Sequence, residues 1–224
     1  AVSGEPNLLD PQADNTVPNT RINRQIFECL VFVTEEGEIE PWLAESWDFE
    51  DDTTIIFNLR QGVKFHNGEE LKATDVLFSF ERGQRLHPAV NSIMGIVDVA
   101  GSEAVDDYTV KIKLVNPFAA ALRYLGHQNA GIVSEKAVTD AGGDEAFAQN
   151  PIGGTGCFKF ASWDTGDQIS LERYEDYWGD DKPAYEKLTF RFIAETTNRT
   201  IELETGNVDI ILDVASSDVQ KIED

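Results

Sequence analysis

Strand-like and helix-like segments alternate along almost the whole chain of 224 residues, and this alternation sets the class of fold. In the segment 109–114 (TVKIKL) every second residue is apolar, which is the pattern of a half-buried strand. A similar pattern lies at 55–60, and apolar residues at helical spacing follow at 73–86. The mixture predicts a mixed α/β (α+β) body in which helices cover sheets.

The remaining elements are predicted from the same two periodicities. Helical spacing predicts helices in four further segments, at 22–33, 118–125, 134–149 and 197–204. Strands are expected at 63–65, 158–163, 169–174, 188–193 and 208–212. Residues 1–20 are polar and rich in proline, which predicts an irregular, anchored loop, and Asn67-Gly68 predicts a tight turn. The composition shifts at 150–158 (NPIGGTGCF), after which strand patterns dominate.

The charge of the chain restricts its partners. Eighteen Lys and Arg residues stand against 41 Asp and Glu residues, which gives a formal net charge of −23. Such a surface repels phosphate backbones and anionic lipid head groups, so nucleic acid is not an expected partner. The excess of acidic residues has two possible explanations, and both stay open. One is solubility in a salty environment, and hence a halophilic origin. The other is attraction of a cationic partner. No apolar run approaches the roughly 20 residues of a membrane helix. The sequence opens at Ala1 with no Met, so processing could have removed a signal peptide and its absence decides little.

The cysteines and glycines do not form a recognisable metal, cofactor or nucleotide motif. Cys29 and Cys157 form no CxxC pair and have no histidine at ligand spacing, so neither a metal site nor a cofactor is expected. A disulfide between them stays open for an oxidising compartment. The run GGTG at 153–156 lacks the Lys-Ser or Lys-Thr of a phosphate-binding loop and favours an ordinary turn.

Catalytic motifs are equally scarce. The chain has no G-x-S-x-G elbow of a serine hydrolase. A pair of carboxylates could hydrolyse a glycoside, but nothing in the sequence singles out two of the 41. No catalytic residue is therefore named.

Three histidines are far apart in the sequence. His66 ends a strand beside the Asn67-Gly68 turn, which favours a structural role, and His87 precedes Pro88 in an expected exposed loop. His127 lies between a predicted helix and a strand, among glycine and polar residues that could line a cleft.

Seven short motifs occur in a fixed order along the chain. They are NLLDPQ (7–12), QIFECLV (25–31), IEPWLAESW (39–47), FNLRQGVKFHNGEELKATDVLFSFER (57–82), NPIGGTGCFKF (150–160), LERYEDYWGDDKP (171–183) and LETGNVDII (203–211). In this order and spacing they resemble the family 5 extracellular solute-binding proteins of ABC transporters, which bind dipeptides, oligopeptides or nickel. The resemblance covers almost the whole chain.

The resemblance implies a periplasmic-binding-protein-like fold of class II. Since the family's chains are about twice as long, this chain is expected to hold lobe I with its extra subdomain, while lobe II is absent. Residues 1–31 plus 149–224 would form the lobe I core (subdomain Ia, incomplete), and 32–148 would form the inserted subdomain Ib. The turn after His66 would be a scaffold corner away from the ligand.

The resemblance also implies a function without catalysis. A monomeric receptor would bind a small solute, with a peptide the first expectation, in a cleft between the lobes and deliver it to an ABC transporter permease in the membrane. Its place would be periplasmic or extracellular, as a cell-surface lipoprotein if the source is Gram-positive. The positions that would contact the solute, taken from their place in the pattern, are Asn15, Thr16, Val17, His127, Gln128, Asn129, Gly154 and Thr155.

One departure from the family pattern leaves an alternative open. Cys157 stands where the family has proline, and a bridge to Cys29 could compensate for the change. Two alternative functions also stay open. The protein could be a hydrolase with paired carboxylates, or a ligand-free adaptor that binds a receptor.

Overall fold

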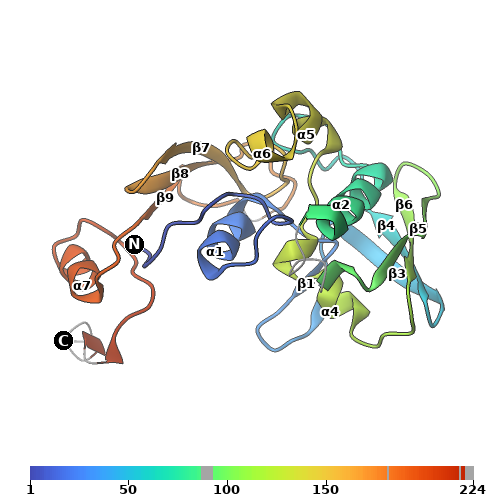
Figure 1. The fold of residues 1–224 in the computed structure, drawn as a ribbon, viewed down its shortest axis with the longest axis horizontal. Coiled ribbons are helices and arrows are strands. Elements are labelled where there is room, and N and C mark those ends of the chain that lie inside the picture. The colour runs from blue at the N-terminus through green and yellow to red at the C-terminus, as the bar shows by residue number, and fades with distance from the viewer. Residues whose placement is uncertain (87–92, 181, 217, 220–224) are drawn as a thin grey trace.

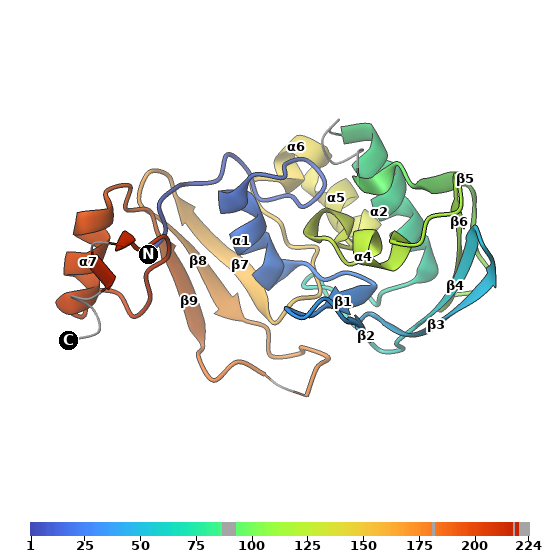
Figure 2. The same cartoon turned by 90° about the horizontal axis from the view of Figure 1, so that it is seen from below.

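The computed structural model describes residues 1–86, 93–180, 182–216 and 218–219. His87 lies outside the described residues. The molecule is elongated, and its N-terminal residues meet the C-terminal part of the chain near one end (Figure 1). The view in Figure 2 shows that two sheets occupy different ends of this shape.

The larger sheet has four antiparallel strands in the order β3-β4-β6-β5. These strands are β3 (Ala44–Asp51), β4 (Thr54–Leu59), β5 (Val97–Ala104) and β6 (Thr109–Leu114). Helix α2 (Ala73–Leu86) packs against β5 and β6. The apolar side chains of β4 and β6 that alternate in sequence are buried, so both strand predictions and the helix prediction at 73–86 are confirmed.

The second sheet is antiparallel, with the order β7-β8-β9. It consists of β7 (Phe158–Asp164), β8 (Gln168–Arg173) and β9 (Lys187–Arg191). Helix α1 (Val17–Ile26) packs against β7, as Figure 2 shows, and α7 (Thr196–Glu204) follows β9.

Short elements connect the two sheets. They are the hairpin of β1 (Val31–Val33) and β2 (Ile39–Pro41), then α4 (Ala121–Leu125), the 3-10 helix η1 (Gln128–Ala130), α5 (Glu135–Ala141) and α6 (Asp144–Phe147). No helix in the described ranges is long and apolar enough to cross a membrane.

Two clusters of buried apolar side chains form the core. The first lies between the four-stranded sheet and α2 and includes Phe57, Phe65 and Phe80. The second includes Phe27 and Phe158 and also takes in apolar side chains from 133–147. The division of the chain into 1–31 plus 149–224 and 32–148 stays a prediction.

Three element predictions are wrong. The helix expected at 22–33 begins earlier and ends at Ile26, because Pro18 suits its first turn and Phe27 is already extended (φ −118°, ψ 141°). Leu30 is buried and Val31 begins β1, so the apolar residues at this point belong to a strand that enters the core. The segment 208–212 is irregular, and 63–65 contributes only the single bridge between Lys64 and Glu70.

Candidate functional site

Two of the three segments predicted to contact a solute are joined directly by hydrogen bonds. The Asn129 side-chain amide donates to the carbonyls of Pro11 and Asp14, the latter at 3.0 Å. Gln12 Nε2 donates to the Gly131 carbonyl at 2.9 Å. The third segment meets the end of α1, where Gly156 N donates to the Ile26 carbonyl at 2.9 Å. Segments up to 130 residues apart in sequence thus gather around α1.

The residues that precede α1 are open to solvent. Asp14 is buried and accepts hydrogen bonds from Thr16 N (2.9 Å) and Thr16 Oγ1 (2.7 Å), which fixes the entry into the helix. Asn15, Thr16 and Val17 are exposed, with Val17 58% exposed. These three side chains are therefore accessible to a solute.

His127 is exposed, whereas the two residues after it are not. Its Nδ1 accepts a hydrogen bond from Asn129 N at 3.2 Å, so the neutral ring carries its proton on Nε2. Partial removal of the imidazole from water by its neighbours, and secondly the positive charge of Arg24, lowers the pKa of His127. The ring therefore offers an N–H donor at neutral pH. Gln128 and Asn129 are buried, and their ligand contact stays a prediction.

The glycine turn at 153–156 supports the site from inside. A Cβ on Gly154 would lie 2.0 Å from the Ile26 carbonyl oxygen, so only glycine allows the backbone to come this close. Thr155 is completely buried, and its Oγ1 donates to Glu28 Oε2 at 2.7 Å. Direct solute contact by these two residues also stays a prediction.

Glu28 is a buried carboxylate that the sequence analysis did not single out. Besides Thr155, its donors are Trp42 Nε1 (2.9 Å), Tyr177 O–H (2.9 Å) and Trp178 Nε1 (2.8 Å). Burial raises the pKa of Glu28, and these hydrogen bonds oppose that rise. The carboxylate thus fastens the end of α1 to three distant segments. Its only signal in the sequence was its position inside the QIFECLV motif.

The two cysteines are free thiols in the structure, so the disulfide considered above is not formed. Cys29 Sγ donates to the His127 carbonyl at 3.2 Å. Burial raises the pKa of the Cys29 thiol to about 12. Both cysteines line a small pocket of about 180 Å³ next to Glu28.

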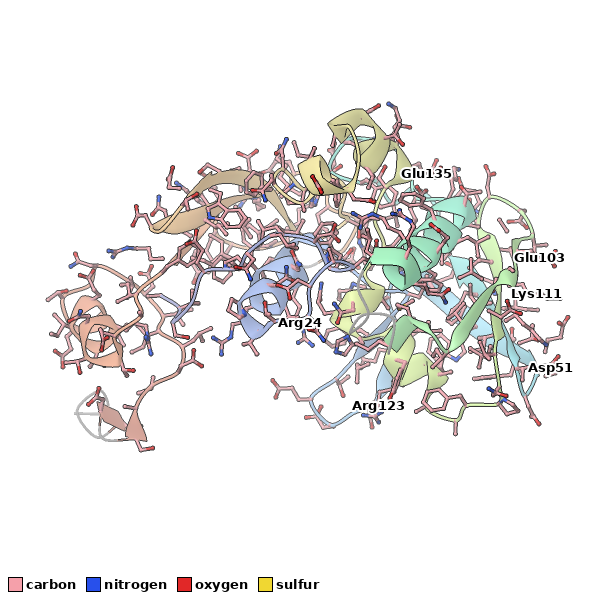
Figure 3. All side chains as sticks on the ribbon, in the orientation of Figure 1. Arg24, Asp51, Glu103, Lys111, Arg123 and Glu135 are labelled. Carbon is pink, nitrogen blue, oxygen red and sulfur yellow. The ribbon has the colours of Figure 1, made fainter. Side chains whose placement is uncertain are left out.

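A larger pocket of about 650 Å³ opens beside His127. Its lining comes from α1, the β1–β2 hairpin, α4 and the start of η1, and consists of Arg24, Phe32, Val33, Thr34, Glu35, Glu36, Arg123, Gly126 and His127. Figure 3 shows Arg24 and Arg123 on the side of the molecule opposite α5. Of this lining only His127 was predicted, because the other residues come from segments whose proximity the sequence does not reveal.

The described residues contain no group of three or more His, Cys, Asp or Glu side chains arranged to hold a metal ion. The candidate site is an open pocket whose arginine, glutamate and histidine side chains can offer hydrogen bonds and charge to a solute.

Comparisons with known proteins agree with this description. The family model for "Bacterial extracellular solute-binding proteins, family 5 Middle" matches residues 38–224. The glutathione-binding protein GsiB of Pectobacterium atrosepticum is 30% identical over 199 residues, which cover 88% of this chain and 38% of that protein.

Solved structures give the same result. One is the periplasmic binding protein DppA of Helicobacter pylori in complex with the peptide STSA. It superposes on this chain with a TM-score of 0.87 and is 30% identical to it, and the match covers 99% of this chain and 47% of the DppA chain. AgaA of A. tumefaciens, in complex with agropinic acid, has a TM-score of 0.87 and 31% identity, with 99% and 44% covered.

The chain spans less than half the length of each of these relatives. The matched range, the two sheets with their helices and the ordered motifs support one assignment. The chain belongs to the bacterial extracellular solute-binding proteins of family 5.

Proposed function

We propose that the complete protein binds a small solute, with a peptide the first candidate, in a cleft to which this chain contributes one wall. The observation that carries the proposal is the open pocket of about 650 Å³ beside His127. The relatives are described as binding glutathione, a peptide and agropinic acid, so the family accepts small organic solutes of several kinds.

The solute contacts proposed for this chain are the exposed ones. Asn15, Thr16 and Val17 lie before α1, and His127 offers its Nε2–H to an acceptor. Gln128, Asn129, Gly154 and Thr155 would support this surface from beneath, where a solute could meet their backbone groups. Closure of a second lobe would bury the solute and shift the population toward the closed form.

The proposal extends to the protein's partners and location. The closed form would deliver its solute to an ABC transporter permease, and the protein would act outside the cytoplasmic membrane, in the periplasm or on the cell surface as a lipoprotein. It would act as a monomer and would not bind nucleic acid, consistent with a net charge of −23. No bond of the solute needs to be broken, so neither a catalytic pair nor a cofactor enters the proposal.

Native mass spectrometry of the intact gene product, purified without denaturation from its source, tests the proposal. A bound small molecule released on unfolding is expected. An empty protein that stays empty after incubation with the small-molecule fraction of its growth medium would contradict it. A stable complex with a receptor domain under those conditions would favour an adaptor instead.

A further inference from the structure

Two cysteines from distant parts of the chain face the same small pocket. Cys29 and Cys157, the two cysteines of the sequence, both line the pocket of about 180 Å³ next to Glu28. Both are free thiols in this structure. Burial raises the pKa of each thiol, and the negative charge of Glu28 adds to the rise in both, so the two sulfurs lie within reach of one carboxylate. The fold therefore brings the two thiols to one place.

The backbone segments that carry the two cysteines are bonded to each other. On one side, Gly156 N donates to the Ile26 carbonyl at 2.9 Å. On the other, Thr155 Oγ1 donates to Glu28 Oε2 at 2.7 Å. A Cβ on Gly156 would lie 2.4 Å from the Gln25 carbonyl oxygen, so glycine is required for this close approach. These contacts keep the two cysteines near each other as long as the glycine turn is packed on the end of α1.

Little has to be broken for the two sulfurs to approach each other. The hydrogen bond from Cys29 Sγ to the His127 carbonyl, at 3.2 Å, is a weak S–H donation. Gln128 lines the same pocket and is buried, and its amide nitrogen has no hydrogen-bond partner among the described residues. That amide can turn aside without losing a bond. The pocket thus gives the cysteine side chains room to reach the geometry of a disulfide, with Cα atoms about 4.4–6.8 Å apart.

We propose that Cys29 and Cys157 form a reversible redox pair that closes to a disulfide across this pocket when a small-molecule disulfide oxidises it. The structure holds the reduced state. Cys157 is the less buried thiol, so its thiolate attacks the small disulfide first, forms a mixed disulfide and releases one small thiolate. The Cys29 thiolate then displaces the second small thiolate. Two protein thiols are oxidised, one small disulfide is reduced to two thiols, and these take up the two protons.

Closure of the disulfide would also change the wall of the larger pocket. The S–H of Cys29 that donates to the His127 carbonyl would be lost, just before η1 begins. The new bond would tie the end of α1 to the glycine turn at 153–156. The oxidised form would therefore hold these two segments more firmly and release the start of η1. The inference is independent of the proposed function, because it concerns the chain's own thiols and its test needs no solute.

The test uses the intact gene product, kept reduced during purification and then incubated with oxidised glutathione at pH 8. Remaining thiols are blocked with iodoacetamide, the protein is digested without reduction, and mass spectrometry identifies the linked peptides. We expect a peptide pair that joins Cys29 to Cys157 and disappears after treatment with dithiothreitol. The urea midpoint of unfolding should rise by about 1 M on oxidation, because the bridge closes a long loop in the unfolded chain.

Single variants separate the two steps. Cys29→Ser leaves Cys157 without a thiol to resolve it, so the mixed disulfide with glutathione should accumulate there. Cys157→Ser removes the accessible thiol, and Cys29 should then stay reduced. Cys29→Ala loses the hydrogen bond to His127 without forming a disulfide. Amide hydrogen exchange at 128–131 should therefore be faster both in reduced Cys29→Ala and in the oxidised parent than in the reduced parent.

Several results would overturn the redox pair. A mixed disulfide that persists on Cys157 of the parent while Cys29 stays free would show that the two sulfurs cannot meet. Thiols that stay reduced in oxidised glutathione, or disulfides formed only between two protein molecules, would also contradict it. A Cys29–Cys157 bridge with unchanged exchange at 128–131 would overturn the effect on η1. None of these results bears on whether the protein binds a solute.

Discussion

The guanidinium of Arg82 lies 2.5 Å from Asp10 Oδ2, and both side chains are fully buried. Arg82 also donates to Gln12 Oε1 at 2.7 Å and to Asp144 Oδ1 at 2.7 Å. One side chain of α2 therefore fastens the N-terminal loop and α6 together. Because that loop leads into Asn15, Thr16 and Val17, the ion pair positions part of the proposed site.

Replacing Arg82 by methionine should lower the free energy of unfolding by about 3–5 kcal/mol, because the buried Asp10 would lose its countercharge and keep the hydrogen bond from Gln12 N. Urea denaturation followed by tryptophan fluorescence measures the change. Arg85→Met is the matched control, since Arg85 is half exposed in its ion pair with Asp144 and should cost no more than about 1 kcal/mol. Equal losses in the two variants would contradict the prediction.

Stability should depend on pH through His66. Its Nε2 donates to the Gly156 carbonyl at 2.8 Å, and burial lowers its pKa to about 4 from the ordinary 6.5. The unfolded state binds the proton more readily, so this stability is present above pH 6.5 and is lost as pH falls toward 4. The loss should reach about 3 kcal/mol.

The His66→Gln variant isolates this effect, because the glutamine amide can still donate to Gly156. The difference in unfolding free energy between parent and variant should change across that pH range. A difference that stays constant from pH 7 to pH 4 would show that His66 does not titrate as described.

Gly154→Ala should destabilise the protein by about 3 kcal/mol, because its Cβ would lie 2.0 Å from the Ile26 carbonyl oxygen and the backbone must shift. Gly166→Ala is the control. It has no atom within 4 Å and carries only the cost of a positive φ (78°), about 1 kcal/mol. Thermal unfolding of both variants compares their losses of stability. A smaller loss for Gly154→Ala than for Gly166→Ala would contradict the prediction.

Cys29 should resist thiol reagents in the native protein, since its thiol is buried and its pKa is raised to about 12. Cys157 is less buried, so its alkylation by iodoacetamide at pH 8 should be faster. Mass spectrometry of peptides from samples taken at successive times measures the alkylation rate of each cysteine. Equal rates would mean that the segment around Cys29 opens before it reacts.

The elements predicted best are those whose two faces differ most in polarity. Helix α2 occupies 73–86 as predicted, and β6 follows the alternating run at 109–114. The strands β3 and β5 were not predicted, because both lie at the edges of the sheet and most of their residues are exposed or half-buried, so a clear apolar alternation does not mark them. The predicted strand at 208–212 has apolar residues but no strand partner in the described chain.

The site was harder to predict than the fold, because polarity alone does not separate a binding residue from a supporting one. Asn129 and Thr155 were predicted to contact a solute, yet both are fully buried and hydrogen-bond to other parts of the protein. Arg24 and Arg123 lie almost 100 residues apart in sequence, and the fold brings α1, α4 and the β1–β2 hairpin to the lining of one pocket.

The hydrogen bonds of Glu28 also constrain the order of folding. Thr155, Tyr177 and Trp178 follow Glu28 by 127, 149 and 150 residues, so the ribosome makes Glu28 long before most of its donors. Until those residues arrive, the carboxylate is better solvated by water than by an incomplete interior. The end of α1 therefore cannot reach its final packing during early synthesis. Its closure requires long loops to form, which makes it a slow, late step of folding.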